Sequence, residues 1–440
     1  MDTFRDGGLH GWIAVLGLFT AKVAWNIISK GLGMMLPTLQ EQFLTSTWLI
    51  GWIFALVDAG IQFSGILATP LKERFGARTV VTVSGLVAGI SMIAASFLPS
   101  LYAITLTLAV LTGPAVGISF IVTKHLVGGY FSQSITLAYG IANLGDSFAF
   151  VAAVPLIQLF LDIYGWRGTM LLLGALFLHL AVCGALIKPT AARCSHNGYE
   201  AAHMDEDQEA IKNDKVVPRS CFSCACFTTL NSSAKDTFRL GLLSSISFWL
   251  VVFIVCVWTM VYMAWIIYYV QYSTVYKDFT LEDASHFIVS YGIGRTVACI
   301  VICPLINSVQ AVSTYTWLAI AQLLVAMYYA VDPWLTSYWA AMANAFMFGN
   351  AFAMSSILID VATKKVFGKE QMGHAMGLLG VASGSTLLLL LYFPGLIYDT
   401  IGDYKVVFSL MAGVQLLAVA AAPWLHWRQK IQRSSSEAQP

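Results

Sequence analysis

Twelve long apolar stretches, six on each side of one hydrophilic segment, constrain this chain more than any other feature. Each is at least as long as the roughly 20 residues that an α-helix needs to cross about 30 Å of hydrocarbon. No water reaches the backbone inside a bilayer, so a single segment crosses only as a helix. With 58% hydrophobic and 11% charged residues, the chain also has too few charges to solvate a globular surface. We therefore predict an all-α membrane protein with twelve transmembrane helices surrounded by lipid.

The predicted spans cover residues 11–37, 47–70, 78–98, 101–127, 134–160, 166–188, 245–272, 281–308, 310–331, 334–363, 371–396 and 405–427. They divide the chain into an N-terminal six-helix bundle (1–190), a linker loop (191–244), a C-terminal six-helix bundle (245–427) and a tail (428–440). The first span contains two lysines and is too long for the apolar core of a cleaved signal peptide, so we expect it to be retained.

Lysine and arginine residues are distributed unequally between the two sets of loops, and this bias sets the orientation of the helices. With the N-terminus inside, the cytoplasmic face receives Arg5, Lys72, Arg74, Arg78, the basic residues from Lys188 to Arg239, Lys364, Lys365, Lys369, Arg428, Lys430 and Arg433. The opposite face receives only Arg167, Lys277 and Lys405. We therefore expect a multi-pass plasma-membrane protein with both termini and the linker loop in the cytoplasm.

The hydrophilic segment 191–244 has few large apolar residues and no sustained periodicity, which predicts a flexible cytoplasmic linker. It contains a tight cluster of Cys221, Cys224 and Cys226. A zinc knuckle would need a fourth ligand at suitable spacing, palmitoylation is a second interpretation, and an ordinary reduced loop is a third. We predict no metal and no cofactor. The net charge of +1 and the absence of a basic stripe with interleaved aromatics argue against a nucleic-acid partner.

Charged residues inside the predicted spans are the strongest functional signal, because each costs about 2.5–3.5 kcal/mol at the centre of a helix. They are Lys22 and Lys30 on the first span, Asp58 on the second, Asp146 on the fifth and Arg295 on the eighth. In one interpretation, the two aspartates neutralise two of the three cations and hold helices together. In the other, all five face a water-accessible cavity, where one anionic charge on a substrate would balance the positive surplus.

Three more polar residues, Lys124, His125 and Asp360, fall near the cytoplasmic ends of spans. We interpret them as side chains that extend to the membrane interface. Gly373 and Gly377 have the small-xxx-small spacing that lets helices approach closely.

Several motifs resemble signatures of the monocarboxylate transporter family. Residues 6–12, Asp-Gly-Gly-Leu-His-Gly-Trp, resemble the signature ahead of its first helix, with Leu9 in place of an aromatic residue and one residue inserted. Residues 164–168, Tyr-Gly-Trp-Arg-Gly, resemble its second signature, ahead of helix six. Further matches are Gly129-Tyr130-Phe131, Cys183 to Pro189, Tyr398-Asp399 and Gly402-Asp403-Tyr404. The family is a branch of the major facilitator superfamily, so the resemblance implies two six-helix bundles that rock about a central site.

The resemblance also implies roles for individual residues. Lys30 falls where the family carries the lysine that captures the substrate carboxylate, and Arg295 falls where it carries the arginine of helix eight. Tyr291, one turn before Arg295, replaces the aspartate of proton-coupled members, and a phenol does not titrate near neutrality.

Other positions depart from the lactate carriers. Ser134 and Ile135 replace the family's arginine pair, Asp146 stands where it has a small serine-proline region, and Asp58 is also unlike those carriers. The resemblance therefore implies a carboxylate carrier but leaves specificity for lactate unsupported.

Our sequence-based hypothesis is a transporter, not an enzyme, that moves small monocarboxylates or related organic anions by alternating access, as a secondary active or facilitative carrier. The candidate substrate-binding residues are Lys30, Arg295, Tyr291, Asp146, Asp58 and Lys22. Two other hypotheses stay open: a carrier of a creatine-like or amino-acid-like zwitterion, and a transport-inactive receptor or scaffold with the same fold. Lactate-type members associate with a single-span glycoprotein, so the resemblance makes such an ancillary subunit a candidate partner.

The orientation is tested by labelling intact cells. Epitope tags at residue 1, within residues 200–215 and after Gln439 should be protected from impermeant reagents, because all three positions are predicted to be cytoplasmic. Cysteines introduced near Lys277 or Gly402 should react. Labelling of the linker loop from outside would contradict the orientation.

Overall fold

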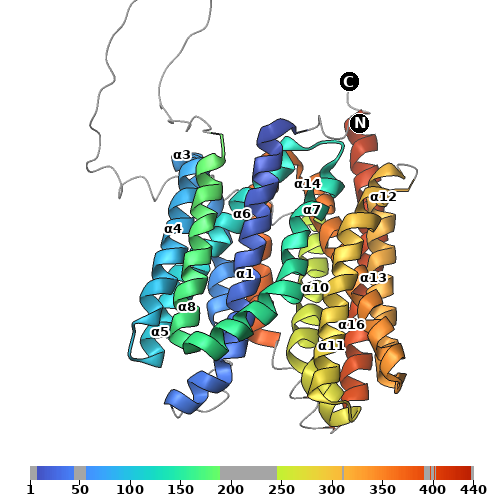
Figure 1. Cartoon of the computed structure of the whole chain (residues 1–440). Helices are drawn as coiled ribbons and strands as arrows, with labels where there is room; N and C mark the ends of the chain where they lie inside the picture. The colour runs from blue at the N-terminus through green and yellow to red at the C-terminus, as the bar shows by residue number, and fades with distance from the viewer. Residues whose placement is uncertain are drawn as a thin grey trace, which may run out of the picture.

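The computed structural model describes residues 7–43, 56–188, 245–309, 312–390 and 403–437, together with residues 397 and 401. All regular secondary structure in these ranges is helical, in agreement with the predicted all-α class. The linker loop with its three clustered cysteines lies outside the described residues. Figure 1 shows the helices running side by side, with the first half of the chain in blue to green beside the second half in yellow to red.

The first half contains the elements α1 (Gly8–Phe43), α3 (Gly65–Phe75), α4 (Ala77–Ser96), α5 (Leu101–Thr107), η2 (Leu108–Thr112), α6 (Gly113–Tyr130), α7 (Ile135–Phe148), η3 (Ala149–Ala153) and α8 (Val154–Leu186). The second half contains α10 (Ile246–Gln271), η5 (Tyr272–Tyr276), α11 (Leu281–Val297), η6 (Ala298–Ile302), α12 (Cys303–Ser308), α13 (Thr314–Val331), η7 (Asp332–Trp334), α14 (Tyr338–Leu390) and α16 (Tyr404–Glu437).

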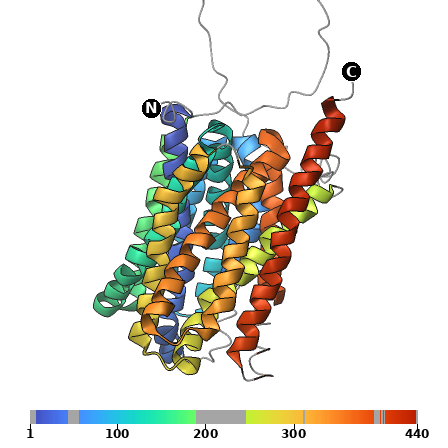
Figure 2. The same cartoon turned by 90° about the vertical axis from the view of Figure 1, so that its right-hand side faces the viewer.

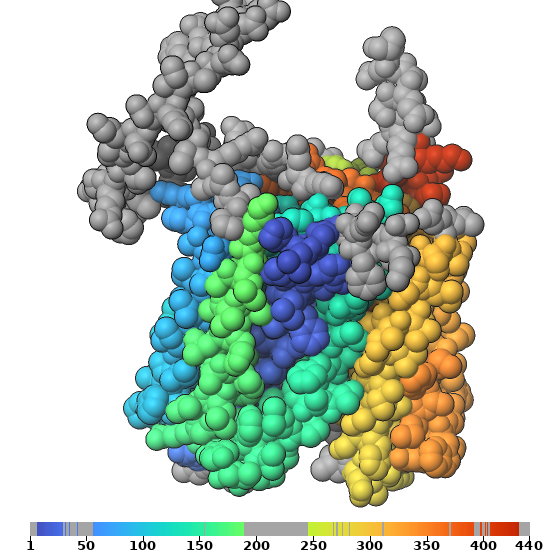
Figure 3. Space-filling view, turned by 45° about the horizontal axis from the view of Figure 1, so that its top comes forward, coloured from blue at the N-terminus to red at the C-terminus, as the bar shows by residue number. Residues whose placement is uncertain are grey.

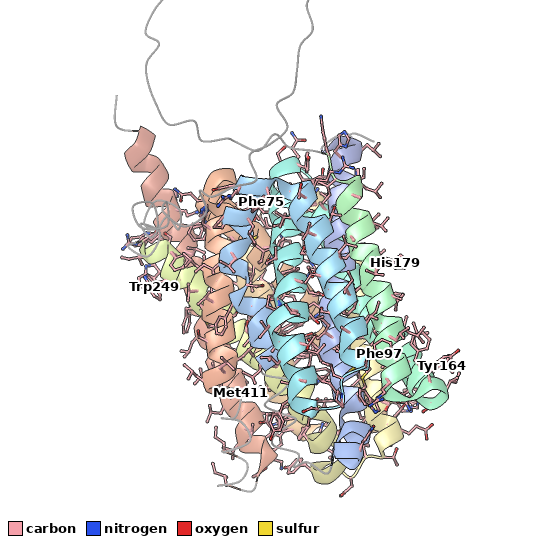
Figure 4. All side chains as sticks on the ribbon, turned by 90° about the vertical axis from the view of Figure 1, so that its left-hand side faces the viewer. Phe75, Phe97, Tyr164, His179, Trp249 and Met411 are labelled. Carbon is pink, nitrogen blue, oxygen red and sulfur yellow. The ribbon has the colours of Figure 1, made fainter. Side chains whose placement is uncertain are left out.

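Eleven helices in the described ranges are long and apolar enough to cross a membrane. The predicted second span, 47–70, begins among residues that are not described, and its visible part is helical from residue 56. Apolar side chains project from the outer surface of the bundle (Figure 4), where Phe75, Phe97, Tyr164 and Trp249 are each more than half exposed. Lipid is the medium that suits such a surface.

Two long helices contain tight turns at glycine. Gly165 in α8 has φ 64° and Gly368 in α14 has φ 68°, a conformation that side chains with a Cβ rarely adopt. Each turn separates two membrane-spanning segments that the sequence predicts as distinct spans. α1 begins and α16 ends at the same end of the bundle (Figure 2), which we call the predicted cytoplasmic end.

Prolines shape three of the helices. Three five-residue π-helical turns each end two residues before a proline: Leu108–Thr112 before Pro114, Ala149–Ala153 before Pro155, and Ala298–Ile302 before Pro304. Proline has no N–H to donate and its ring clashes with the carbonyl four residues earlier, so the preceding turn widens. Two of these wide turns begin three residues after Asp146 and Arg295, and so lie beside the candidate site.

The two halves meet along α3, α6 and α7 on one side and α11, α12 and α14 on the other. At the predicted cytoplasmic end, Gly65 of α3 faces Gly377 of α14, as the small-residue spacing predicts. A Cβ added to Gly377 would lie 2.6 Å from the Gly65 carbonyl oxygen, so only glycine fits there. The same end of α14 places Gly373 against the His125 ring. The seam between the halves is therefore closed at this end.

The interpretation of Lys124 and Asp360 as interface-reaching side chains was wrong. Lys124 Nζ lies 2.6 Å from Asp360 Oδ1, and the Asp360 side chain is only 8% exposed. The two residues belong to α6 and α14, in different halves, so each compensates the burial of the other across the seam. The sequence of one helix does not reveal a partner that lies on a distant helix.

Two further contacts surround this ion pair. Tyr139 of α7 donates from its hydroxyl to the Lys124 carbonyl oxygen at 3.1 Å. Lys72, just beyond the predicted second span, places Nζ 3.1 Å from His125 Nδ1. Burial lowers the pKa of Lys72, and the charge of Glu73 opposes that effect.

Candidate functional site

The first helix presents a row of polar side chains to the fifth predicted span. Lys22 and Asn26 are four residues apart in α1, so both point to the same side of the helix. Lys22 Nζ lies 2.9 Å from Asp146 Oδ2 and donates to Asn143 Oδ1 at 2.8 Å. Asn26 Nδ2 donates to the other Asp146 oxygen, Oδ1, at 2.8 Å. Figure 3 shows α1 between α8 and α7, the two helices that it contacts.

A glycine allows this contact to form. Gly145 precedes Asp146 in α7, and a Cβ at Gly145 would lie 2.6 Å from the Phe19 carbonyl oxygen of α1. A larger residue would therefore push α7 away from α1. The close approach brings the short aspartate side chain within reach of Lys22.

Arg295 joins this cluster from the other half of the protein. Its Nη2 lies 2.9 Å from Asp146 Oδ2, the same oxygen that Lys22 contacts. Its Nη1 donates to the Tyr291 hydroxyl oxygen at 3.1 Å, and the Arg295 side chain is 2% exposed. Since α7 and α11 belong to different halves, Asp146 holds one cation from its own half and one from the opposite half.

The ion cluster of Lys22, Asp146 and Arg295 carries two positive charges and one negative charge. Asp146 thus plays the neutralising role of the first interpretation, yet one positive charge stays unbalanced within the cluster. A buried unbalanced charge is costly. One carboxylate from outside the protein would neutralise it.

Asp58 does not join the ion cluster. It is 4% exposed, and its Oδ1 accepts a hydrogen bond from Trp25 Nε1 of α1 at 2.9 Å. Its Oδ2 is buried and accepts no hydrogen bond from any described residue. No lysine or arginine in the described part of the chain lies within ion-pair distance of it. The expected pairing of both aspartates with cations therefore holds for Asp146 alone.

Lys30 occupies the position in α1 that follows Asn26 by four residues, which continues the row of Lys22 and Asn26 along the helix. Its side chain lies outside the described residues. A role for Lys30 in the site stays a prediction. Across the described ranges, no group of three or more His, Cys, Asp or Glu residues is placed to hold a metal ion.

Aromatic rings surround the buried guanidinium. Arg295 Cζ lies 5.7 Å from the centroid of the Tyr291 ring, 5.9 Å from that of Phe150 and 6.0 Å from that of Phe352. Such distances suit cation–π attraction, which partly replaces the lost water. Trp265 adds a second layer, with its ring 4.4 Å from that of Tyr291.

Our sequence reasoning missed this aromatic shell. A signal was present in α10, where Trp258, Tyr262, Trp265 and Tyr269 recur at helical spacing and so share one face. Trp258, Tyr262 and Phe352 form a stack with ring centroids 4.7–5.5 Å apart and interplanar angles of 17–23°.

Comparisons with known proteins agree with this architecture. The sequence profile of the Major Facilitator Superfamily matches residues 14–387. Monocarboxylate transporter 12 from Rattus norvegicus is 26% identical over 415 residues, 92% of this chain and 83% of the relative. Monocarboxylate transporter 11 from Mus musculus is 36% identical over 186 residues, which cover 42% of this chain and 41% of the relative.

Among solved structures, the proton:xylose symporter XylE of the major facilitator superfamily, bound to 6-bromo-6-deoxy-D-glucose, superposes with a TM-score of 0.71. The match covers 93% of this chain and 94% of the symporter at 11% sequence identity. At that identity the likeness shows the shared fold alone.

The ion cluster predicts a specific pattern of stability. Asp146→Asn removes the negative charge that Lys22 and Arg295 share in the described part of the chain, and losing one partner of a buried ion pair costs about 3–5 kcal/mol. We expect a clear fall in the thermal stability of the purified protein. Lys22→Met in the same chain should restore part of it, because one of the two opposed cations is then gone. Additive losses in the double variant would show that the two residues are not coupled.

Proposed function

Because the chain belongs to the Major Facilitator Superfamily and is similar over most of its length to monocarboxylate transporter 12, we propose that it carries small monocarboxylates or related organic anions across the plasma membrane by alternating access. The observation that carries this proposal is the buried ion cluster with one surplus positive charge, shared between the two halves. Family membership makes the protein a transporter and not an enzyme. The substrate, the membrane and the energy coupling belong to the proposal.

Arg295 is the residue best suited to hold a substrate carboxylate. Its planar guanidinium offers several donors in a fixed fork, and its buried Nε donates to no acceptor among the described residues. Two of its other donors contact Asp146 and Tyr291. A carboxylate that approaches Arg295 therefore finds an unused donor and the surplus charge together.

Asp146 links substrate binding to the movement of the halves. The Arg295–Asp146 contact crosses the seam, so rocking of the halves must break or rearrange it. Breaking it without a replacement would leave a buried charge unpaired, at a cost of about 3–5 kcal/mol. A bound carboxylate compensates Arg295 while Lys22 still compensates Asp146. Substrate thereby lowers the barrier between the two conformations, which is what a carrier requires.

The ion pair at the predicted cytoplasmic end supplies the matching closure. Lys124 and Asp360 join α6 to α14 on the predicted cytoplasmic side of the ion cluster, near the contact of Gly65 with Gly377. For the site to open towards the cytoplasm, these contacts must separate. The pair is partly accessible through the Lys124 side chain, which is 15% exposed, so water can hydrate both charges as they part.

A receptor or scaffold with the same fold is the candidate from a different class. Such a protein needs no cycling site. Uptake of labelled acid combined with counterflow separates the two, because only a carrier exchanges internal for external substrate faster than it achieves net uptake.

Removing the proposed carboxylate ligands should abolish transport. We expect Arg295→Gln and Lys30→Ala each to lower uptake of a labelled organic acid by at least about tenfold, the cost of about 1.4 kcal/mol of lost binding. Surface biotinylation should show both variants at the plasma membrane. Arg428→Gln, on the half-buried C-terminal part of α16, is the matched control and should transport normally. Near-normal uptake by Arg295→Gln would remove this residue from the site.

The energy coupling is predicted from Tyr291. A phenol cannot exchange protons near neutral pH as the aspartate of proton-coupled relatives does, and here its oxygen accepts a hydrogen bond from Arg295. We expect uptake to respond little to an imposed proton gradient at clamped membrane potential. Strong stimulation by an inward gradient, abolished in Asp146→Asn or His125→Gln, would contradict this and identify the proton site.

A further inference from the structure

Asp58 is a buried carboxylate whose charge nothing in the described part of the protein balances. Its described hydrogen-bond donor is the neutral indole of Trp25, and the hydroxyl of Ser29 is its other polar neighbour. Its Oδ2 accepts no hydrogen bond from the residues that the structure describes. An isolated buried carboxylate costs several kcal/mol unless a partner compensates it. Asp58 takes no part in the proposed exchange of ion partners between Lys22, Asp146 and Arg295.

The surroundings of Asp58 connect it to the ion cluster through α1. On α1, Trp25 contacts Asp58 while Lys22 and Asn26, on either side of it in sequence, contact Asp146. Across the seam, Arg295 contacts the same Asp146 carboxylate that Lys22 and Asn26 contact. Asp58 and Arg295, of opposite charge, are therefore both linked to the same turn of α1 and belong to facing halves of the protein.

Aromatic faces accompany Asp58 as well. Trp25 packs edge-on against Phe120 with ring centroids 4.9 Å apart. Tyr262 belongs to the stack with Trp258 and Phe352, and Phe352 is also one of the rings beside Arg295. A carboxylate next to aromatic rings is the environment that proteins use for ammonium, guanidinium and quaternary ammonium groups.

We infer that Asp58 is a subsite for a cationic group, so that the transported molecule is a zwitterion with its carboxylate at Arg295 and its cation at Asp58. This rests on the proposed function and narrows its substrate class. The charges then balance in pairs: the substrate carboxylate neutralises the surplus of the ion cluster, and the substrate cation neutralises Asp58. A plain monocarboxylate would satisfy the first and leave the second unpaired.

The test compares acids that differ only in the cation. γ-Guanidinobutyrate and trimethylglycine are each paired with a neutral isostere, γ-ureidobutyrate and tert-butylacetate respectively. In cells that express the wild-type protein, uptake of each cationic acid should exceed that of its isostere by at least about tenfold. The cationic acids should also be the stronger inhibitors of each other's uptake, a measurement that needs no variant.

Variants then assign this preference to Asp58. Asp58→Asn should lower the ratio of cationic to neutral uptake by at least about tenfold, and Asp58→Glu should keep part of it because the charge remains. Asp162→Asn, an exposed acid at the turn of α8, is the matched control and should not change the ratio. Surface biotinylation corrects each value for expression.

The possible results separate this inference from the function on which it rests. Equal or better wild-type uptake of the neutral isosteres, lost in Arg295→Gln, would overturn the cation subsite while the carboxylate carrier stands. A cationic preference that persists in Asp58→Asn would equally remove Asp58 from the subsite. If no acid of either kind is taken up or exchanged by the wild-type protein, the proposed function itself is wrong.

Discussion

The sharing of one aspartate between two cations is the interaction on which the rest of this structure depends. Asp146 gives the same oxygen to Lys22 from its own half and to Arg295 from the opposite half. In a medium that does not solvate ions, such a cluster is stable only if its charges balance. With two cations and one anion it does not balance, and we propose that this deficit makes it a binding site as well as a packing contact.

The backbone is adapted to hold that cluster at the seam. Gly145 lets α7 approach α1, and the wide turns ahead of Pro155 and Pro304 begin just beyond Asp146 and Arg295. A proline in a transmembrane helix frees a carbonyl and permits a local adjustment of the helix. The two halves thus meet at the site through segments that differ from a regular α-helix. On the predicted cytoplasmic side of the site, the glycines of α3 and α14 bring the halves into contact.

The fold class and the candidate site residues could both be predicted from the sequence, because both follow from the free-energy cost of placing polar groups in lipid. Hydropathy predicts the helices, and the same cost identifies Lys22, Asp58, Asp146 and Arg295 as unusual. It does not predict pairings between residues far apart in the chain. Only the structure therefore showed that Asp146, and not Asp58, pairs with Lys22 and Arg295.

Two other features were also beyond sequence reasoning, for related reasons. The Lys124–Asp360 pair looked like two separate interface residues, since each lies near the end of its own helix. The aromatic shell of Arg295 combines rings from η3, α10, α11 and α14, and only the periodic row in α10 was visible beforehand. The placement of the Lys30 side chain stays a prediction.

We propose that, during transport, a substrate carboxylate pairs with Arg295 while Lys22 stays paired with Asp146. The most direct measurement is an experimental structure of the protein with a transported acid bound. We predict the carboxylate within hydrogen-bond distance of the Arg295 guanidinium and the Lys22–Asp146 pair intact. A substrate bound elsewhere, with Arg295 still paired to Asp146 and no contact to the carboxylate, would contradict the account.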